Sequence, residues 1–231
     1  MAATKNTHDH LHVEAAQSVL LELARLLHEY EDGMVVVGGA VPGLILDQTR
    51  QDHIGTTDVD IALDHNTIQE VAYRSIMQLL HHRGYQRGEQ PFIFYRSIPV
   101  DGQEIKVEVD FLAAEYGGTG KKHRTQVVQD LRPRKARACD LAFQNPILVT
   151  LEGILPGGGK DRATIRVASM VPFLMMKAQA LVGRLKEKDA YDIYYCLVNY
   201  PGGSDGLAET FRQFPEHPLI QEGLNILAEK F

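Results

Sequence analysis

The chain has few cysteines and no long apolar run, and each shortage excludes a class of protein. Its 231 residues include two cysteines, Cys139 and Cys196. They form no Cys-x-x-Cys pair, so neither a zinc site nor a disulfide framework is indicated. No run of about 18 apolar residues occurs, which argues against a transmembrane helix. Residues 1–17 lack the basic and apolar regions of a secretory signal, so a cytoplasmic location is expected.

Positive charge is also in short supply. Lysine and arginine number 24 against 30 aspartates and glutamates, for a net charge of −6. This balance gives no support for a generally basic nucleic-acid-binding surface. One basic segment stands out, and it contains Lys121, Lys122, His123, Arg124, Arg132, Arg134, Lys135 and Arg137. A solvated loop is the favoured interpretation, and a path for a polyanionic substrate is the alternative.

The remaining composition is that of a globular protein, with 44% hydrophobic and 23% charged residues. Periodicity predicts helices over 11–30, 68–84, 173–185 and 189–200, the second opened by a Thr67-x-x-Glu70 capping box. Apolar or alternating runs predict strands over 34–37, 58–63, 92–98, 104–112, 147–151 and 164–167. Residues 115–145 allow no assignment. We therefore expect an α/β domain over 1–168 and a helical domain over 169–231.

Three carboxylates are the strongest candidates for chemistry. Asp58 and Asp60 are two apart on a predicted strand, so both side chains point to the same face. Neighbouring carboxylates repel unless a cation lies between them, and Mg²⁺ prefers such oxygen ligands together with substrate phosphates. Asp110 could complete the site from a neighbouring strand, with Glu108 on the same face as the alternative. A solvent-exposed sheet face without function is the competing interpretation.

A glycine turn precedes these carboxylates. Gly38-Gly39 follows a predicted buried strand and precedes a short helix, an arrangement that suits phosphate binding; a plain tight turn is the alternative. Gly38-x-Ala40-x-x-Gly43 also approaches the dinucleotide-binding fingerprint. Ala40 replaces the middle glycine of that fingerprint, and Asp58 begins its strand instead of ending it. Both differences count against a dinucleotide site.

Other polar and aromatic residues invite simpler interpretations. His53 and His65 flank the carboxylate strand, but Mg²⁺ disfavours imidazole, so we expect them in solvated loops. The tyrosines at 191, 194 and 195 are expected in the core or at its rim, and not as a platform for base stacking.

The carboxylate and glycine motifs together resemble the polymerase-β-like nucleotidyltransferase superfamily. The matching segments are VVVGGAVPGLIL, GTTDVDIAL and KVEVDFL. The resemblance implies a nucleotidyltransferase fold, with a mixed β-sheet flanked by helices and a helical C-terminal part. It also implies that Asp58, Asp60 and Asp110 bind Mg²⁺ as the catalytic residues, while Gly38 and Gly39 hold the phosphates of a nucleoside triphosphate.

The segment FLMMKAQALVGRLKEKDAYDIYYCL is similar to the AbiEii-type toxin nucleotidyltransferases. The resemblance implies that Lys177, Arg184 and Lys188 hold the triphosphate, while Asp189 and Asp192 position a lysine or the nucleotide. Lys177 and Arg184 are seven residues apart, which on one helix is two turns along the same face. The resemblance further implies an RNA acceptor, particularly tRNA, and an antitoxin protein as a partner.

The resulting hypothesis is transfer of a nucleoside monophosphate from a triphosphate such as ATP to an acceptor hydroxyl, with Mg²⁺ as the cofactor. Two alternatives stay open. The acceptor could be a small molecule, as in antibiotic-modifying relatives, and the acidic charge suits a cationic one. The chain could also be a catalytically silent module of the same fold that binds a nucleotide or a partner.

Overall fold

The computed structural model describes residues 2–46, 53–68, 74–115, 124–184, 186–214 and 216–231. The N-terminal part begins with helix α1 (Ala2–Leu26), followed by a short 3₁₀ helix (His28–Gly33). The helix predicted over 11–30 thus ends earlier than expected. Strand β1 (Met34–Val37) leads into a 3₁₀ turn (Gly38–Ala40) and the short helix α2 (Val41–Ile45), as the sequence predicts.

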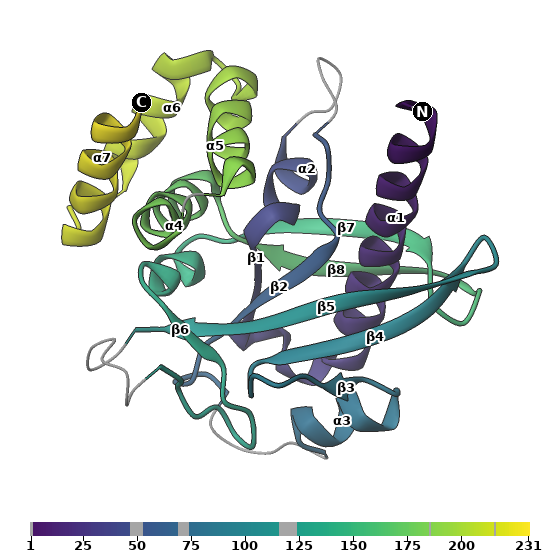
Figure 1. Ribbon diagram of the computed structural model, residues 1–231. Helices are drawn as coiled ribbons and strands as arrows, with labels where there is room; N and C mark the ends of the chain where they lie inside the picture. The colour runs from purple at the N-terminus through teal and green to yellow at the C-terminus, as the bar shows by residue number, and fades with distance from the viewer. Residues whose placement is uncertain (1, 47–52, 69–73, 116–123, 185, 215) are drawn as a thin grey trace.

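An eight-stranded mixed sheet forms the centre of the molecule (Figure 1). Its order is β3-β4-β5-β2-β1-β8-β7, with β6 paired to β5. The remaining strands are β2 (Asp58–Leu63), β3 (Gln86–Arg87), β4 (Ile93–Val100), β5 (Gln103–Ala114), β6 (Arg134–Ala136), β7 (Ile147–Ile154) and β8 (Lys160–Val167). β2 runs antiparallel to β1 and parallel to β5. This confirms the α/β class with a mixed sheet.

Two hairpins extend the sheet beyond its short central strands. β4 and β5 are joined at Asp101-Gly102, and β7 and β8 form the second hairpin. α1 packs against strands of both hairpins and against β2, while helices α4–α7 lie at the opposite end of the molecule (Figure 1). β7 ends the sheet order, and it carries Ile147, Leu148 and Ile154 at 40%, 68% and 53% exposure.

The C-terminal part is helical, as predicted. It comprises α4 (Met170–Gly183), α5 (Glu187–Asn199), α6 (Gly203–Gln213) and α7 (Pro218–Lys230). Phe173, Leu174 and Ile193 from these helices belong to the same buried cluster as Val36, Ile61 and their neighbours in the sheet. One apolar core therefore joins the two parts of the chain. None of the helices, as far as the structure describes them, is long and apolar enough to cross a membrane.

Two segments differ from their sequence-based assignments. The helix predicted from residue 68 is observed as α3 (Ile76–His82), and Ser75 and Gln78 form its capping box. Thr67 instead donates a hydrogen bond to Asp64, and Glu70 of the predicted box lies outside the described residues. The unassigned stretch 115–145 contributes β6 and a 3₁₀ helix (Cys139–Phe143), which are too short for periodicity to show.

Candidate active site

The sheet brings the three predicted carboxylates together. In the parallel pairing of β2 with β5, Asp60 lies directly opposite Asp110, and Asp58 lies opposite Glu108. Side chains alternate along each strand, so Asp58, Asp60 and Asp110 share one face while Val59, Val109 and Phe111 are buried on the other. Residues separated by about 50 positions in the chain thus become neighbours through one strand pairing.

Burial, followed by crowding of negative charge, dominates the electrostatics of this face. Burial, together with the charges of Asp58 and Asp110, raises the pKa of Asp60 to about 7. Lys177 and Arg134 act in the opposite direction but do not offset these effects. Burial also raises the pKa of Asp110. Arg134 and Lys177 therefore compensate the negative charge only in part, and a bound cation would compensate it further.

Arg134 is a functional candidate that sequence reasoning missed. Its Nη2 donates to Oδ2 of Asp110 at 2.7 Å, and this contact partly counteracts the rise in the pKa of Asp110. The solvated-loop interpretation is wrong for this residue of the basic segment, whereas Lys121, Lys122 and His123 lie outside the described residues. Oδ1 of Asp110 is buried and has no hydrogen-bond partner in the described part of the chain.

The glycine turn is fitted to the carboxylates. Gly38 has φ of +70°, and a Cβ there would lie 1.8 Å from Oδ2 of Asp60, so no other residue fits without displacing that carboxylate. A Cβ at Gly39 would lie 2.8 Å from both Nζ of Lys188 and Oγ1 of Thr56. Thr56 in turn donates a hydrogen bond to Asp58. The bend thus places a lysine ammonium beside the carboxylate strand.

The C-terminal residues identified by resemblance form an ion network. Nζ of Lys177 lies 2.7 Å from Asp189 and 2.8 Å from Asp192. Arg184 donates through Nε to Asp189 at 3.0 Å, and Lys188 lies 3.3 Å from Asp192. Burial lowers the pKa of Lys177, but Asp192 and Asp189 outweigh it and raise the pKa above its usual value.

These contacts give Lys177, Arg184 and Lys188 different surroundings. Lys177 is buried between two carboxylates, so its first role is to hold α4 to α5. The expectation that Arg184 shares a helix face with Lys177 is wrong, because α4 ends at Gly183 and Arg184 has extended backbone. Lys188 keeps 39% of its side chain exposed and lies beside Gly39. Arg184 is 48% exposed, and its carboxylate partner is Asp189.

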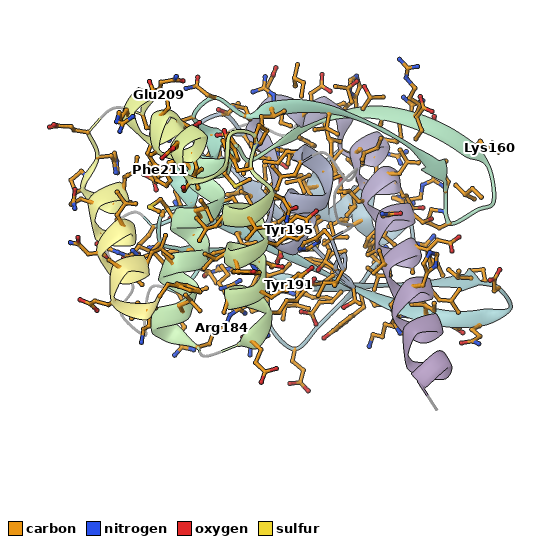
Figure 2. The ribbon with its side chains drawn as sticks, turned by 90° about the horizontal axis from the view of Figure 1, so that it is seen from above. Lys160, Arg184, Tyr191, Tyr195, Glu209 and Phe211 are labelled. Atoms are coloured by element: carbon orange, nitrogen blue, oxygen red, sulfur yellow. The ribbon has the colours of Figure 1, made fainter. Side chains whose placement is uncertain are left out.

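His53 is buried, and the solvated-loop prediction for it is wrong. The N–H of Gly55 donates to its Nδ1 at 3.1 Å, so Nε2 carries the proton and donates to Asp192 at 3.0 Å. Its ring also packs on Tyr191 and Tyr195, at centroid distances of 5.5 and 4.8 Å. These tyrosines point from α5 toward the middle of the molecule (Figure 2). Tyr191 and Tyr195 are therefore packing residues, as predicted, whereas the prediction is wrong for Tyr194, which is 61% exposed.

A large cavity opens beside the carboxylate strand. It has a volume of about 1060 Å³ and is lined by α1, by both hairpins, and by segments that include Gly39, Thr56 and Asp58. Asp60 and Asp110 lie outside its lining. Asp58 therefore belongs both to the carboxylate cluster and to the wall of a space large enough for a small molecule.

The carboxylates do not form a closed metal cage. Among the described residues, no three His, Cys, Asp or Glu side chains converge closely enough to hold an ion by themselves. Mg²⁺ keeps several water and phosphate ligands and needs only one or two carboxylates from the protein. The unpartnered Oδ1 of Asp110 and the raised pKa of Asp60 fit such an open site.

Glu108, the alternative ligand, has another partner. It accepts a hydrogen bond from Tyr95, and this bond raises the pKa of that tyrosine. Asp110 is the neighbour of Asp60, so the geometry favours it over Glu108.

Searches for similar proteins found no match among family models, curated proteins or solved structures.

Proposed function

We propose that the chain is a nucleotidyltransferase that moves a nucleoside monophosphate from a nucleoside triphosphate to an acceptor hydroxyl. One observation carries the proposal: Asp60 and Asp110 lie opposite each other on adjacent strands, against the glycine bend that also approaches Lys188. Phosphoryl transfer depends mainly on positioning and on neutralising phosphate charge. Carboxylates beside a lysine and a close-packed glycine turn suit that task.

Each residue has a role in this proposal. Asp58, Asp60 and Asp110 would hold Mg²⁺, which supplies charge neutralisation for the phosphates when it is bound. Lys188, beside Gly39, would contact the phosphates, and the space at Gly38 and Gly39 would let them approach the backbone. Arg134 would orient Asp110 through the bond to Oδ2, leaving Oδ1 available to accept the proton of the attacking hydroxyl. Lys177, Arg184, Asp189 and Asp192 would support the site by fixing α5.

Nucleotide binding tests the proposal directly. Thermal shift with each common nucleoside triphosphate should show stabilisation that needs Mg²⁺ and that Asp58→Ala removes. Gly38→Ala should remove it as well, because the new methyl group displaces the Asp60 carboxylate. Transfer of α-³²P label to an acceptor, measured alongside, reports the chemistry.

Gly102→Ala is the matched control for the glycine variant. Gly102 also has positive φ, +77°, but a Cβ there meets nothing within 4 Å. Both variants should lose about 1 kcal/mol or more of stability from backbone strain, and only Gly38→Ala should lose nucleotide binding. Equal stabilisation by the triphosphate in wild type and Asp58→Ala would refute the proposed site.

A further inference from the structure

The cavity beside Asp58 has an unusual charge. Its lining includes the carboxylates of Glu14 on α1, Asp58, Asp101 at the β4–β5 turn and Glu152 on β7. No lysine or arginine is found among the described residues that line it, and Arg162, from outside the lining, pairs with Glu152 at 3.5 Å. Four carboxylates from four separate elements thus surround one space, and a cationic occupant would be attracted to it.

The rest of the lining is suited to a compact organic molecule. Leu20, Leu21, Val100 and Leu151 supply apolar surface, and Gln17, Ser18 and Thr150 supply hydrogen-bonding groups. Small-molecule pockets are mostly apolar, with few polar groups that fix orientation, and hold roughly 300–1,000 Å³. At about 1060 Å³ the cavity is just larger than that range.

The glycine bend borders both charged regions. Lys188 approaches Gly39 from α5, while the carboxylates of the cavity lie toward α1 and the hairpins. Phosphates are attracted to the lysine side and repelled from the cavity. A molecule of opposite charge is attracted to the cavity, with Asp58 at the boundary between the two.

We infer that the cavity binds the acceptor, and that the acceptor is a compact molecule carrying both hydroxyl groups and protonated amines. The inference rests on the proposed function. In the transfer, an acceptor hydroxyl oxygen forms a bond to the α-phosphorus of the triphosphate. The bond from that phosphorus to the oxygen bridging to the β-phosphate breaks, pyrophosphate leaves, and the hydroxyl proton passes to Asp110.

An RNA acceptor fits this space poorly. Each phosphate of its backbone would approach carboxylates with no cation in the described lining to offset them. Arg134 and Arg137 of the basic segment are already paired with Asp110 and with Glu222, so they offer little free charge to a polyanion. The protonated amines of a polyamine sugar would instead be attracted by the carboxylates that repel RNA phosphates.

A matched pair of glucosamine trimers tests the inference. The free trimer carries amines that are protonated at neutral pH, and its N-acetylated form has the same hydroxyl groups without the charge. Calorimetric titration of the wild-type protein, without metal or nucleotide, should show binding of the free trimer and at least about tenfold weaker binding of the acetylated form. The variant Glu14→Gln/Asp101→Asn/Glu152→Gln should bind the free trimer about tenfold more weakly than wild type.

The control variant is Glu209→Gln, which removes one exposed carboxylate on α6, away from the cavity (Figure 2). It should bind the free trimer as wild type does. Equal binding of both trimers, or no binding of either by wild type, overturns the inference, as would label transfer to tRNA but to neither trimer. Mg²⁺-dependent binding of a triphosphate, measured separately, shows whether the proposed function survives that result. Trimer binding without triphosphate binding would leave a cationic ligand site and refute the transferase.

Discussion

At the scale of single residues, the charged form of Asp60 has the least favourable electrostatic environment in the site. Its carboxylate lies against the α-carbon of Gly38, opposite Asp110 and next to Asp58. Burial and both neighbouring charges raise its pKa from 3.8 to about 7. One pKa unit corresponds to 1.36 kcal/mol, so ionising Asp60 in the folded protein opposes folding by up to about 4 kcal/mol.

The pH dependence of stability follows from this shift. The folded-state pKa exceeds the unfolded value, so the folded chain binds the proton more tightly between about pH 4 and 7, and stability falls as pH rises through that window. Asp60→Asn should remove the effect. In urea unfolding with EDTA, the variant should gain stability over wild type as pH rises from 4 to 8.

A difference between Asp60→Asn and wild type that stays constant over this pH range would show that the carboxylate of Asp60 ionises as freely in the folded protein as in the unfolded chain. Adding Mg²⁺ should stabilise wild type more at pH 8 than at pH 5, because protons and cation compete for the same oxygens.

At the scale of elements, α4 and α5 are joined by charge in a buried setting. Lys177 contacts Asp189 and Asp192, and His53 adds a bond to Asp192 from the loop before β2. Removing one partner of a buried ion pair destabilises the folded protein by about 3–5 kcal/mol, because the remaining charge is left uncompensated. The position of Lys188 beside Gly39 thus depends on the integrity of this network.

Two lysine variants should separate support from phosphate binding. Lys177→Met should lower the free energy of unfolding by about 3–5 kcal/mol. Lys188→Met should cost less than about 1 kcal/mol, since its pair is partly exposed, but should weaken triphosphate binding about tenfold or more. Urea unfolding and equilibrium nucleotide binding measure the two quantities. Comparable losses of stability in both variants would contradict the distinction.

The elements also show what sequence can predict. The sequence predicts strands β1 and β2 at their observed bounds, because short β-branched and apolar runs are a strong signal of strands. The pairing that joins Asp60 to Asp110 was a hypothesis that the observed register supports. His53 and Arg134 could not be predicted as partners of Asp192 and Asp110, because no local pattern encodes contacts across 139 and 24 residues. The helix start at Ser75 carries a Ser-x-x-Gln capping box, but the similar Thr67-x-x-Glu70 pattern eight residues earlier predicts the wrong start.

At the scale of the whole molecule, the apolar core is continuous. Val36 and Ile61 in the sheet belong to the same buried cluster as Phe173 and Ile193 in the helical part, although the sequence suggested two domains dividing after residue 168. Ion pairs cross the same boundary, as between Arg137 and Glu222. Cooperativity follows core continuity, so the parts should not unfold separately.

A single unfolding transition is therefore expected. The nine tyrosines are spread over both parts of the chain, and four of them, at 191, 194, 195 and 200, lie in the helical part. During urea unfolding, tyrosine fluorescence should therefore change in one transition that coincides with the change in far-ultraviolet circular dichroism. The chain has no tryptophan, so the tyrosine signal is not masked. Two separate midpoints would show that the helical part is an independent domain.

The position of β7 at the end of the sheet has a practical consequence. Among the described strands it pairs with β8 alone, and Ile147, Leu148 and Ile154 leave its surface apolar. An exposed edge strand of this kind can pair with a strand of another chain, and an outward-facing lysine or proline commonly prevents that pairing. The segment ILVTLEGI has neither, and its one charge is Glu152. Concentrated samples would therefore self-associate along this border first, and replacing Leu148 with lysine is the simplest way to keep the protein dispersed.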